Sequence, residues 1–368
     1  MEFIRVEDCC EILDSQRKPI TESERVPGRY PYYGANGIQG TINQYIFDGK
    51  LVLVAEDGGH FGSKTKSIAY LVNGKCWVNN HAHVLRAKKG FLAEYICYSL
   101  MFYKIEGYIN GATRQKLTQA ALRKLIIPKR SVEYQKAIVD RLDLVRYIIE
   151  KKQNIINELD LLIKSRFVEM FGDIDCNTKN WPIIALEELA ELITDGEHST
   201  PKRCDKGIYL LSARNILNHS LKLDDVDYID EAEYDRISKR VIPKAGDILL
   251  SCSGSVGRCC MAPMEIKFQL VRSVALIRFK SEITPIFAEH MITSDWFQRQ
   301  INSLKTTSSQ ANLFQGRIKK LKGFVPDMNL QYEFIKVVNQ INKLKSDVQK
   351  SIDETQLLMD SLMQEYFG

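Results

Sequence analysis

Residues 131–172, SVEYQKAIVDRLDLVRYIIEKKQNIINELDLLIKSRFVEMFG, are the stretch from which the fold of this chain follows. They contain no proline and no glycine before the last position, and their apolar residues recur in heptads. Sustained apolar a and d positions over several heptads predict a coiled-coil helix, roughly 60 Å long at about 1.5 Å per residue. One seam position carries Leu142, Ile149, Ile156, Ile163 and Met170, and the other carries Ile138, Val145 and Leu159, with Lys152 interrupting it.

A second stretch of the same kind closes the chain. Prolines at 128 and 326 precede the two stretches, as expected where a strand or loop ends before a helix begins. We expect the two helices to pair antiparallel; the alternative is that each packs only on its own domain. In the second helix, one predicted seam position carries Phe334, Ile341, Val348 and Leu362 with Thr355 as the polar exception, and the other carries Val337, Leu344 and Leu358 with Ser351 between them.

The remainder of the chain also repeats, with an offset of 180 to 198 residues. VEDCCEIL (6–13) returns as LEELAELI (186–193), HVLRAK (83–88) as ALIRFK (275–280), LAEYI (92–96) as FAEHM (287–291), LTQAALRKL (117–125) as FQGRIKKL (314–321), and EMFG (169–172) as EYFG (365–368). This period is far longer than the roughly 20–50 residues of a solenoid unit. The chain is therefore a duplicated domain plus a duplicated helix, and the predicted segments are domain 1 (1–128), central helix (129–172), domain 2 (173–326) and C-terminal helix (327–368).

Each domain is expected to mix strands and helices. Short β-rich runs, such as 50–56 and 67–72 in the first domain and 208–213, 246–253 and 274–280 in the second, are separated by glycine-containing turns. One helix is predicted in each domain, at 91–103 and 285–301. Regular βα alternation is missing, which disfavours a doubly wound sheet. The predicted fold class is α+β, with two tandem mixed α/β domains, two long helices forming an antiparallel coiled coil, and approximate two-fold symmetry.

Composition and charge limit the class of protein. No apolar run approaches the roughly 18 residues that span a bilayer, and the N-terminal residues lack the order of a signal peptide. Nine cysteines without a CxxC pair indicate reduced thiols in a cytoplasmic protein. Residues 1–172 carry 26 Lys and Arg against 19 Asp and Glu, whereas residues 173–368 carry 25 against 27. If both halves bind a polyanion, charge alone is not the reason, and the contacts must be local.

The sequence contains no catalytic constellation that survives inspection. In GGHFGSKT (58–65), Ser63 breaks the spacing of a phosphate-binding loop, and GANGIQG (34–40) is a turn rather than a dinucleotide fingerprint. His81 and His83 alternate on a strand, but a third metal ligand is missing, so a hydrogen-bonded structural pair is favoured over a metal site. The Asn/Asp-Pro-Pro-Tyr/Phe motif of amino-methyltransferases is also missing. We predict no catalytic residue and no metal site in this chain.

Polar and basic side chains cluster in the turns of both domains. Arg, Lys, Asn and Gln are the residues that pair with base edges or hold phosphates. Any single one is more often solvated surface, but their recurrence at matching places in both copies favours DNA binding. The candidate DNA-binding residues are Lys64, Lys66, Asn79, Asn80, Arg114, Gln115 and Lys116 in the first domain, and His198, Thr200, Lys202, Arg203, Arg214, Asn215, Arg258, Lys305, Gln310 and Asn312 in the second.

Several segments resemble one known family in this order. ITDGEHSTPKRCDKGIYLLSARNI (193–216) and GDILLSCSGSVGR (246–258) look like the opening and the middle strand of a target recognition domain. YYGANGIQGTINQYIFDGKLVLVAEDGG (32–59) and VNGKCWVNNHAHVL (72–85) are similar to a second variety of that domain. Over its full length the chain resembles the specificity subunit of a type I restriction–modification system. The first copy lacks the TDGxHxTP string and the second lacks the NNHAH string, so the two domains are expected to recognise different half-sites.

The resemblance implies a role in DNA recognition. Each domain would bind one part of an interrupted DNA sequence, and the helix pair would act as a ruler for the spacer. Two methyltransferase subunits, which bind S-adenosylmethionine, would methylate adenine, and restriction subunits would use ATP and Mg²⁺. This chain would contribute no catalytic residue and no cofactor. The alternative from another class is a coiled-coil scaffold that never touches DNA; a stand-alone nuclease or methyltransferase is disfavoured by the missing motifs.

Overall fold

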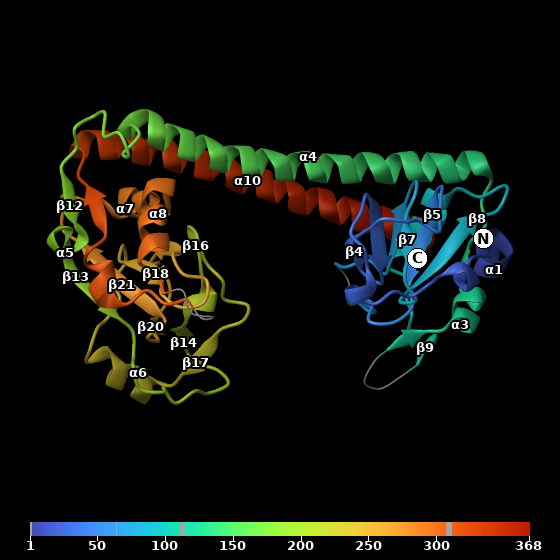
Figure 1. Cartoon of the computed structure of the whole chain (residues 1–368), viewed down its shortest axis with the longest axis horizontal. Helices are drawn as coiled ribbons and strands as arrows, with labels where there is room; N and C mark the ends of the chain where they lie inside the picture. The colour runs from blue at the N-terminus through green and yellow to red at the C-terminus, as the bar shows by residue number, and fades with distance from the viewer. Residues whose placement is uncertain (1, 64, 111–114, 307–310) are drawn as a thin grey trace. The chain divides into compact units, whose positions relative to one another are not determined.

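The computed structural model describes residues 2–63, 65–110, 115–306 and 311–368. The chain divides into two compact units (Figure 1). Unit 1 consists of Met1–Asn154 and Gln349–Gly368, and unit 2 consists of Ile155–Val348. Each unit therefore contains one globular domain and one half of each long helix. Within the described residues, no helix is long and apolar enough to cross a membrane.

The globular part of unit 1 is built on a four-stranded antiparallel sheet in the order β2-β8-β5-β6. A three-stranded sheet, β4-β3-β7, lies beside it and contains one parallel pair, β3 with β7. The strands are β1 (Phe3–Arg5), β2 (Cys10–Ile12), β3 (Tyr30–Gly34), β4 (Gly37–Ile42), β5 (Leu51–Ala55), β6 (Ala69–Val72), β7 (Trp77–Val78), β8 (Ala82–Ala87), β9 (Ile109–Asn110), β10 (Lys116–Leu117) and β11 (Ile126–Pro128). The short helices are α1 (Val6–Cys9), η1 (Asp14–Gln16), η2 (Glu22–Glu24), α2 (Ala93–Met101) and α3 (Gln119–Lys124).

Strand β5 explains why this sheet is covered on both faces. Its sequence LVLVA is apolar throughout, and every residue is buried. Val52 and Val54 belong to the cluster that contains Tyr95 of α2, whereas Leu51 and Leu53 pack in the cluster of β7. Since neighbouring residues of a strand point to opposite faces, a continuous apolar run requires a helix on one face and a second sheet on the other.

Unit 2 repeats this arrangement. Its four-stranded antiparallel sheet has the order β13-β21-β18-β19, and its three-stranded sheet, β17-β14-β20, also contains one parallel pair. The strands are β12 (Ile183–Ala185), β13 (Ala190–Asp195), β14 (Ile208–Leu211), β15 (Ile216–Leu217), β16 (Ser220–Leu221), β17 (Asp227–Ile229), β18 (Ile248–Ser251), β19 (Cys259–Met261), β20 (Phe268–Leu270), β21 (Val274–Phe279) and β22 (Lys322–Phe324). The helices are α5 (Leu186–Leu189), η3 (Ala213–Asn215), α6 (Glu231–Ser238), α7 (Pro285–Thr293), α8 (Asp295–Leu304) and α9 (Gln315–Ile318).

The helix predicted at 285–301 is in fact two helices. The backbone of Ser294 is extended, with φ of −65° and ψ of 150°, so it ends α7. The hydroxyl of Ser294 then accepts a hydrogen bond from the backbone N–H of Phe297 at 3.3 Å and caps α8. Serine favours such N-cap positions because its side chain satisfies one of the unpaired N–H groups of the first turn.

The two long helices, α4 (Val132–Phe171) and α10 (Met328–Phe367), pair antiparallel (Figure 1). In unit 1, Arg141 donates a hydrogen bond to the hydroxyl of Tyr366 at 3.0 Å. In unit 2, Lys345 forms an ion pair with Asp160. Residue numbers rise along one helix as they fall along the other, which confirms the predicted antiparallel pair. The alternative, that each helix packs only on its own domain, is therefore wrong.

The predicted seam is correct for α4 and half wrong for α10. Buried residues such as Leu142 and Ile163 follow the predicted positions of α4. On α10, however, the predicted seam residues Leu344 and Leu358 are 54% and 50% exposed. By contrast, Ile352, which directly follows the predicted seam residue Ser351, is 8% exposed. The second seam position of α10 is in fact occupied by Val338, Lys345, Ile352, Met359 and Tyr366. These residues follow Leu142, Ile149, Ile156, Ile163 and Met170 of α4 with a constant offset of 196.

Candidate nucleic-acid interface

A pocket of about 580 Å³ opens on unit 1 beside the three-stranded sheet. Two of the predicted DNA-binding residues, Asn79 and Asn80, line it. The rest of the wall is provided by the segment before β3, the β3–β4 turn and the segment after β5. The lining residues are Pro19, Ile20, Thr21, Arg25, Tyr32, Ala35, Asn36, Gln39, Asp57, Gly58, Asn79, Asn80 and His81.

The polar groups of this pocket are held in fixed orientations. The guanidinium of Arg25 lies 3.8 Å from the centre of the Tyr32 ring and donates to the Gln39 carbonyl at 3.2 Å. The side-chain amide of Asn79 donates to that of Gln39 at 3.0 Å, and the Asn79 side-chain oxygen accepts from the backbone N–H of His81 at 2.8 Å. Because Asn79 is 4% exposed, it positions Gln39 rather than projecting from the surface. Arginine, glutamine and asparagine are the groups that pair with base edges.

His81, which directly precedes β8, and His83, within β8, each lie within hydrogen-bonding distance of a carboxylate. The Nδ1 of His81 lies 2.6 Å from Asp57 at the pocket. His83 is fully buried, with Nδ1 at 2.6 Å from Asp14 and Nε2 at 2.8 Å from the Leu117 carbonyl. Each ring nitrogen of His83 thus lies within hydrogen-bonding distance of an oxygen. Asp14, Glu56 and His83 belong to one polar network, in which Arg17 pairs with both carboxylates.

This network anchors the segment that follows residues 111–114. Glu56 pairs with Arg17 at 2.6 Å and with Lys116 at 3.0 Å, and its carbonyl accepts from the backbone N–H of Leu117 at 2.7 Å. Burial raises the pKa of Glu56, but the hydrogen bonds from Arg17 and Lys116 outweigh it and hold that pKa below its usual value. Burial also tends to raise the pKa of Asp14. The hydrogen bond and the charge of His83 outweigh the effect of burial and lower that pKa. The predicted DNA-binding residue Lys116 is thus paired with Glu56.

In unit 2, Arg203, Arg214 and His198 are paired with acids. The carboxylate of Asp227 accepts from Arg203 and from Arg214, each at 2.9 Å. Both arginines are exposed at the surface. His198 is paired with Asp195 at 2.9 Å. One acid therefore brings two predicted residues together and preorganises their guanidinium groups.

The exposure of this arginine pair fits contact with a ligand. The side chains of Arg203 and Arg214 are each 47% exposed, and that of Asp227 is 29% exposed. Arg240, which the sequence did not single out, pairs with Asp195 and lies 3.2 Å from His198. Guanidinium groups held by an acid at a surface are positioned to exchange that partner for a phosphate or a base edge.

One predicted DNA-binding residue has a structural role instead. Asn215 is fully buried, and its side-chain oxygen accepts from the backbone and hydroxyl of Ser212 at 2.9 and 3.0 Å. Its amide nitrogen donates to the carbonyls of Lys222 and Asp225 at 2.9 and 2.8 Å. With donors and acceptors used inside the protein, Asn215 cannot read a base in this arrangement, so this prediction is wrong. A short polar residue in a turn often closes the turn on itself, as here.

The other predicted residues differ in accessibility. Asn312 accepts from the hydroxyl of Ser253 at 2.6 Å, and Lys305 donates to Asn302 at 2.7 Å. Arg258 is half-buried, and its backbone N–H donates to Ser251. The exposed residues are Lys66, Asn80, Gln115, Thr200 and Lys202. The predicted residues Lys64, Arg114 and Gln310 lie outside the described residues.

Sequence reasoning missed Arg25, Gln39 and His81 as parts of one pocket. The sequence predicts only a glycine-rich turn for residues 34–40, which include Gln39. Its hydrogen bond to Asn79 joins positions 40 residues apart, which no local pattern reveals. The one available signal was compositional: amide and basic residues gather in the turns of that domain.

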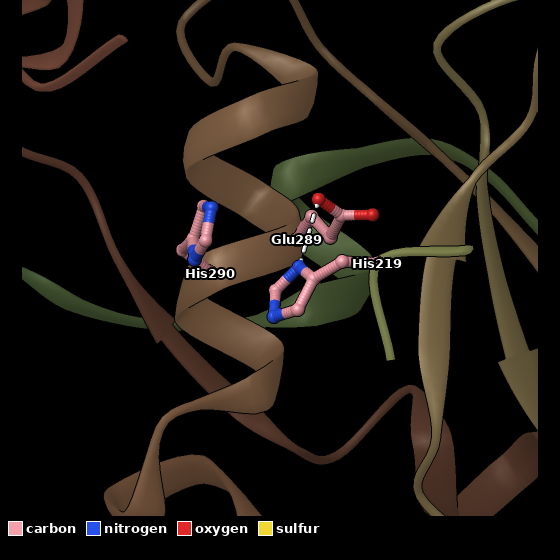
Figure 2. Close-up of side chains that lie close together, drawn as sticks. All are labelled: His219, Glu289 and His290. Carbon is pink, nitrogen blue, oxygen red and sulfur yellow. Dashed lines mark ion pairs between the residues drawn. The ribbon is translucent and has the colours of Figure 1, made fainter. Parts of the chain in front are cut away.

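A second cluster of possible metal ligands lies in unit 2, where α7 meets the turn between β15 and β16 (Figure 2). His219 Nδ1 is 3.0 Å from Glu289, whose other oxygen accepts from the backbone of Met261 at 2.8 Å. The rings of His219 and His290 stack with centroids 4.5 Å apart and planes at 26°. Lone pairs of imidazole lie in the ring plane, so stacked rings do not converge on one ion. Burial lowers the pKa of His290 to about 3, so this imidazole is neutral near pH 7.

The fold of the whole chain is that of known specificity subunits. The S subunit of a type I restriction–modification system from M. genitalium aligns with a TM-score of 0.53 at 16% identity, over 100% of this chain and 96% of that one. A second structure, from work on complex assembly and conformational transition of the type I R-M system, aligns with a TM-score of 0.58 at 14% identity, over 100% and 97%. These likenesses concern the fold.

Sequence comparison identifies the family to which the chain belongs. The family model described as "Type I restriction modification DNA specificity domain" matches residues 1–161 and 178–355, so the chain belongs to this family. A putative type I restriction enzyme specificity subunit of Haemophilus influenzae is 24% identical over 361 residues, covering 96% of this chain and 90% of that protein. The EcoKI specificity subunit of Escherichia coli is 20% identical over 336 residues, covering 85% and 72%.

Proposed function

We propose that this chain is the DNA-recognition subunit of a type I system and binds an interrupted, bipartite DNA site. The observation that carries the proposal is the duplication of the recognition fold with different polar groups on each copy. Family membership and the two specificity subunits among its relatives support the same role. The two domains share one topology but carry different side chains that can form hydrogen bonds with base edges. This arrangement suits two half-sites of different sequence.

Unit 1 would read its half-site through the pocket. Arg25 is stacked on Tyr32, and Gln39 is held by Asn79, so both side chains are oriented before DNA arrives. Preorganised side chains lose less conformational entropy on binding. Asn80, at the rim of the same pocket, is exposed and adds a further amide.

Unit 2 would read its half-site through the arginines at Asp227 and the group at Asp195. Arg203 and Arg214 share the carboxylate of Asp227. When DNA binds the guanidinium group of one arginine, the carboxylate stays available to the other arginine. The acid also lowers the affinity for non-specific phosphate, because it keeps the local charge near neutral. Discrimination would then rest on base edges rather than on net charge.

The partners follow from the type I mechanism. Two methyltransferase subunits that bind S-adenosylmethionine would methylate adenine, and restriction subunits would use ATP and Mg²⁺, so the cofactors would lie outside this chain. Exposed apolar side chains on the long helices offer docking positions for such subunits. Among them, Leu144 and Leu161 on α4 are 58% and 60% exposed, and Leu357 on α10 is 69% exposed. The helix pair would fix the spacer between the half-sites.

Genome-wide methylation mapping tests this proposal. The chain is co-expressed with its neighbouring methyltransferase subunit in a methylation-free host, and modified adenines are mapped. A new interrupted motif with one methylated adenine in each half, on opposite strands, is the expected result. A stable complex without new methylation would contradict it. Substituting both Arg203 and Arg214 by Ala should abolish the motif, while Arg166→Ala, an exposed arginine on α4, should leave it unchanged.

A coiled-coil scaffold that does not bind DNA is the second candidate. The acidic balance of residues 173–368 and the pairing of unit 2 arginines with acids favour it. The slope of log K against log salt separates the two functions. A DNA-binding subunit loses affinity as salt rises, because phosphate contacts release counterions. A scaffold gives no measurable binding at any salt concentration.

A further inference from the structure

Each half of the helix pair contains a lysine at a seam position that is otherwise apolar. Lys152 lies in the seam of α4 within unit 1, and Lys345 lies in the seam of α10 within unit 2. Both are half-buried. Lysine at an a or d position reduces the stability of a coiled coil, so its presence at two such positions calls for a compensating function.

The ammonium group of Lys152 is fully paired by the opposite helix. It donates to the Ser351 carbonyl at 3.0 Å, to the Ser351 hydroxyl at 2.7 Å and to the Thr355 hydroxyl at 2.7 Å. An ammonium has three donors, and all three have an acceptor here. Lys345 in turn pairs with Asp160 of α4. Each helix therefore contributes one lysine and the acceptors for the lysine of the other.

These pairs exist in one register only. A shift by one heptad replaces Thr355 by Val348 or Leu362, and replaces Ser351 by Leu344 or Leu358. All four replacements are aliphatic, so Lys152 would lose every side-chain acceptor. The same shift places Lys345 opposite Gln153 or Phe167 instead of Asp160. A lysine confined among aliphatic side chains without a partner is costly, so shifted registers are disfavoured.

Pairing between two copies of the same helix is disfavoured in the same way. With the offset of 196, the residues of α4 that correspond to Ser351 and Thr355 are Ile155 and Leu159. An α4–α4 pair would therefore set Lys152 against two aliphatic residues. In an α10–α10 pair, the residue that corresponds to Asp160 is Gln356, and Lys345 would lose its acid. Only the pairing of α4 with α10 satisfies both lysines.

We propose that Lys152 and Lys345 form a two-point lock that selects the register and the partner of the long helices. The lock favours α4 paired with α10 over shifted pairs and over pairs of identical helices from two chains. A buried polar residue that fixes coiled-coil register acts by the same principle. The inference concerns the assembly of this chain, and it stands whether or not the proposed DNA-binding function is correct.

Spin-label distances test the lock in the full chain without DNA. The exposed residues Leu144 and Leu357, both in unit 1, are replaced by cysteine and labelled, with the exposed Cys176 and Cys204 replaced by serine. The test variant is Lys152→Leu/Lys345→Ile. With the lysines present, we expect one narrow distribution of the distance between the two spin labels. Without them, we expect a second distance displaced by roughly 10 Å per heptad of shift. Dimers detected by light scattering would report pairing of identical helices.

Two further variants make the result decisive. Lys164→Leu/Lys350→Ile makes the same residue changes at exposed positions of the same helices and should keep the single distance. Lys152→Thr/Thr355→Lys moves the lysine across the seam and should also keep it, because matching is preserved. A single unchanged distance together with an unchanged mass in the test variant would overturn the proposal. Loss of the native distance in the Lys152→Thr/Thr355→Lys variant would also overturn it. The thermal midpoint of the test variant should not fall, since its seam is more apolar.

Discussion

The two recognition domains share one topology but use the same acidic position in opposite ways. Asp14 follows β2 in unit 1, and Asp195 ends β13, the corresponding strand of unit 2. The side chain of Asp14 is 3% exposed and binds His83, whereas that of Asp195 is 20% exposed and binds His198 and Arg240. On the neighbouring strand of unit 2, the residue that pairs with Asp195 is Ala275. Alanine provides no buried partner, so the acid turns to the surface.

The same difference extends to the residues at the end of the central strand of each unit. In both units a leucine N–H donates to the carbonyl at the end of the central strand, Leu117 to Glu56 at 2.7 Å and Leu313 to Cys252 at 2.9 Å. Around this conserved contact, unit 1 builds a charged network, whereas unit 2 uses the neutral pair of Ser253 and Asn312 at 2.6 Å. One backbone scaffold thus carries two different polar environments, as the proposed recognition of two different half-sites requires.

The largest expected effect is the loss of the buried partner in unit 1. His83→Leu leaves Asp14 buried without its imidazole and should lower the free energy of unfolding of unit 1 by about 3 kcal/mol. The remaining hydrogen bonds from Val84 and Gln119 keep the loss at this end of the range. Denaturant unfolding followed by the fluorescence of Trp77, in a Trp181→Phe/Trp296→Phe background, measures this change in unit 1 alone.

The histidine two residues earlier supplies the matched control. His81 is 37% exposed and binds Asp57 at the pocket. Because an exposed ion pair contributes little, His81→Leu should change the unfolding free energy by less than about 1 kcal/mol. Equal effects of the two substitutions would show that the buried network of Asp14 does not distinguish unit 1 from unit 2.

The helix pair and the duplication were predictable because they rest on local periodicity. A heptad pattern reports burial directly, so α4 was placed correctly from Leu142 and its successors. On α10 the pattern misled, since Leu344 and Leu358 look more apolar than Lys345 and yet are exposed. The offset of 196 between the repeats would have placed the seam correctly, because equivalent residues keep equivalent environments.

The arrangement of the candidate DNA-binding residues was only partly predictable. Arg203 and Arg214 are predicted to bind DNA because charge in a turn is visible in sequence, and this stays a prediction. Their shared partner Asp227 was not found, since the pairs join residues 24 and 13 positions apart. Asn215 shows the opposite error, because residue type alone does not separate an amide that closes a turn from one that faces DNA. Long-range pairing decides both cases.

A smaller effect is expected from the arginines of unit 2. Arg203→Ala should weaken binding to the unit 2 half-site by about ten- to a hundred-fold and should relax its specificity, if the guanidinium contacts a base. Binding to the unit 1 half-site should not change, which keeps the comparison between the domains sharp. Fluorescence anisotropy of oligonucleotides that carry one mutated half-site each measures the two affinities separately, on the complex with methyltransferase subunits. Equal weakening at both half-sites would contradict separate reading.

The smallest effect concerns pH in unit 2. Hydrogen bonds from Arg236 lower the pKa of Glu233 from its usual value of 4.5 to about 2, although burial opposes them. A carboxylate with a depressed folded-state pKa stabilises the fold above its unfolded pKa, and this contribution is lost as pH falls from about 4.5 to about 2. Glu233→Gln should therefore flatten the pH dependence of unit 2 unfolding within that window and leave it unchanged near neutral pH. Because Arg236 is 44% exposed, salt should screen the effect. Asp235→Asn, an exposed acid on the same helix, is the control; an equal flattening there would assign the effect to general charge rather than to the Arg236 pair.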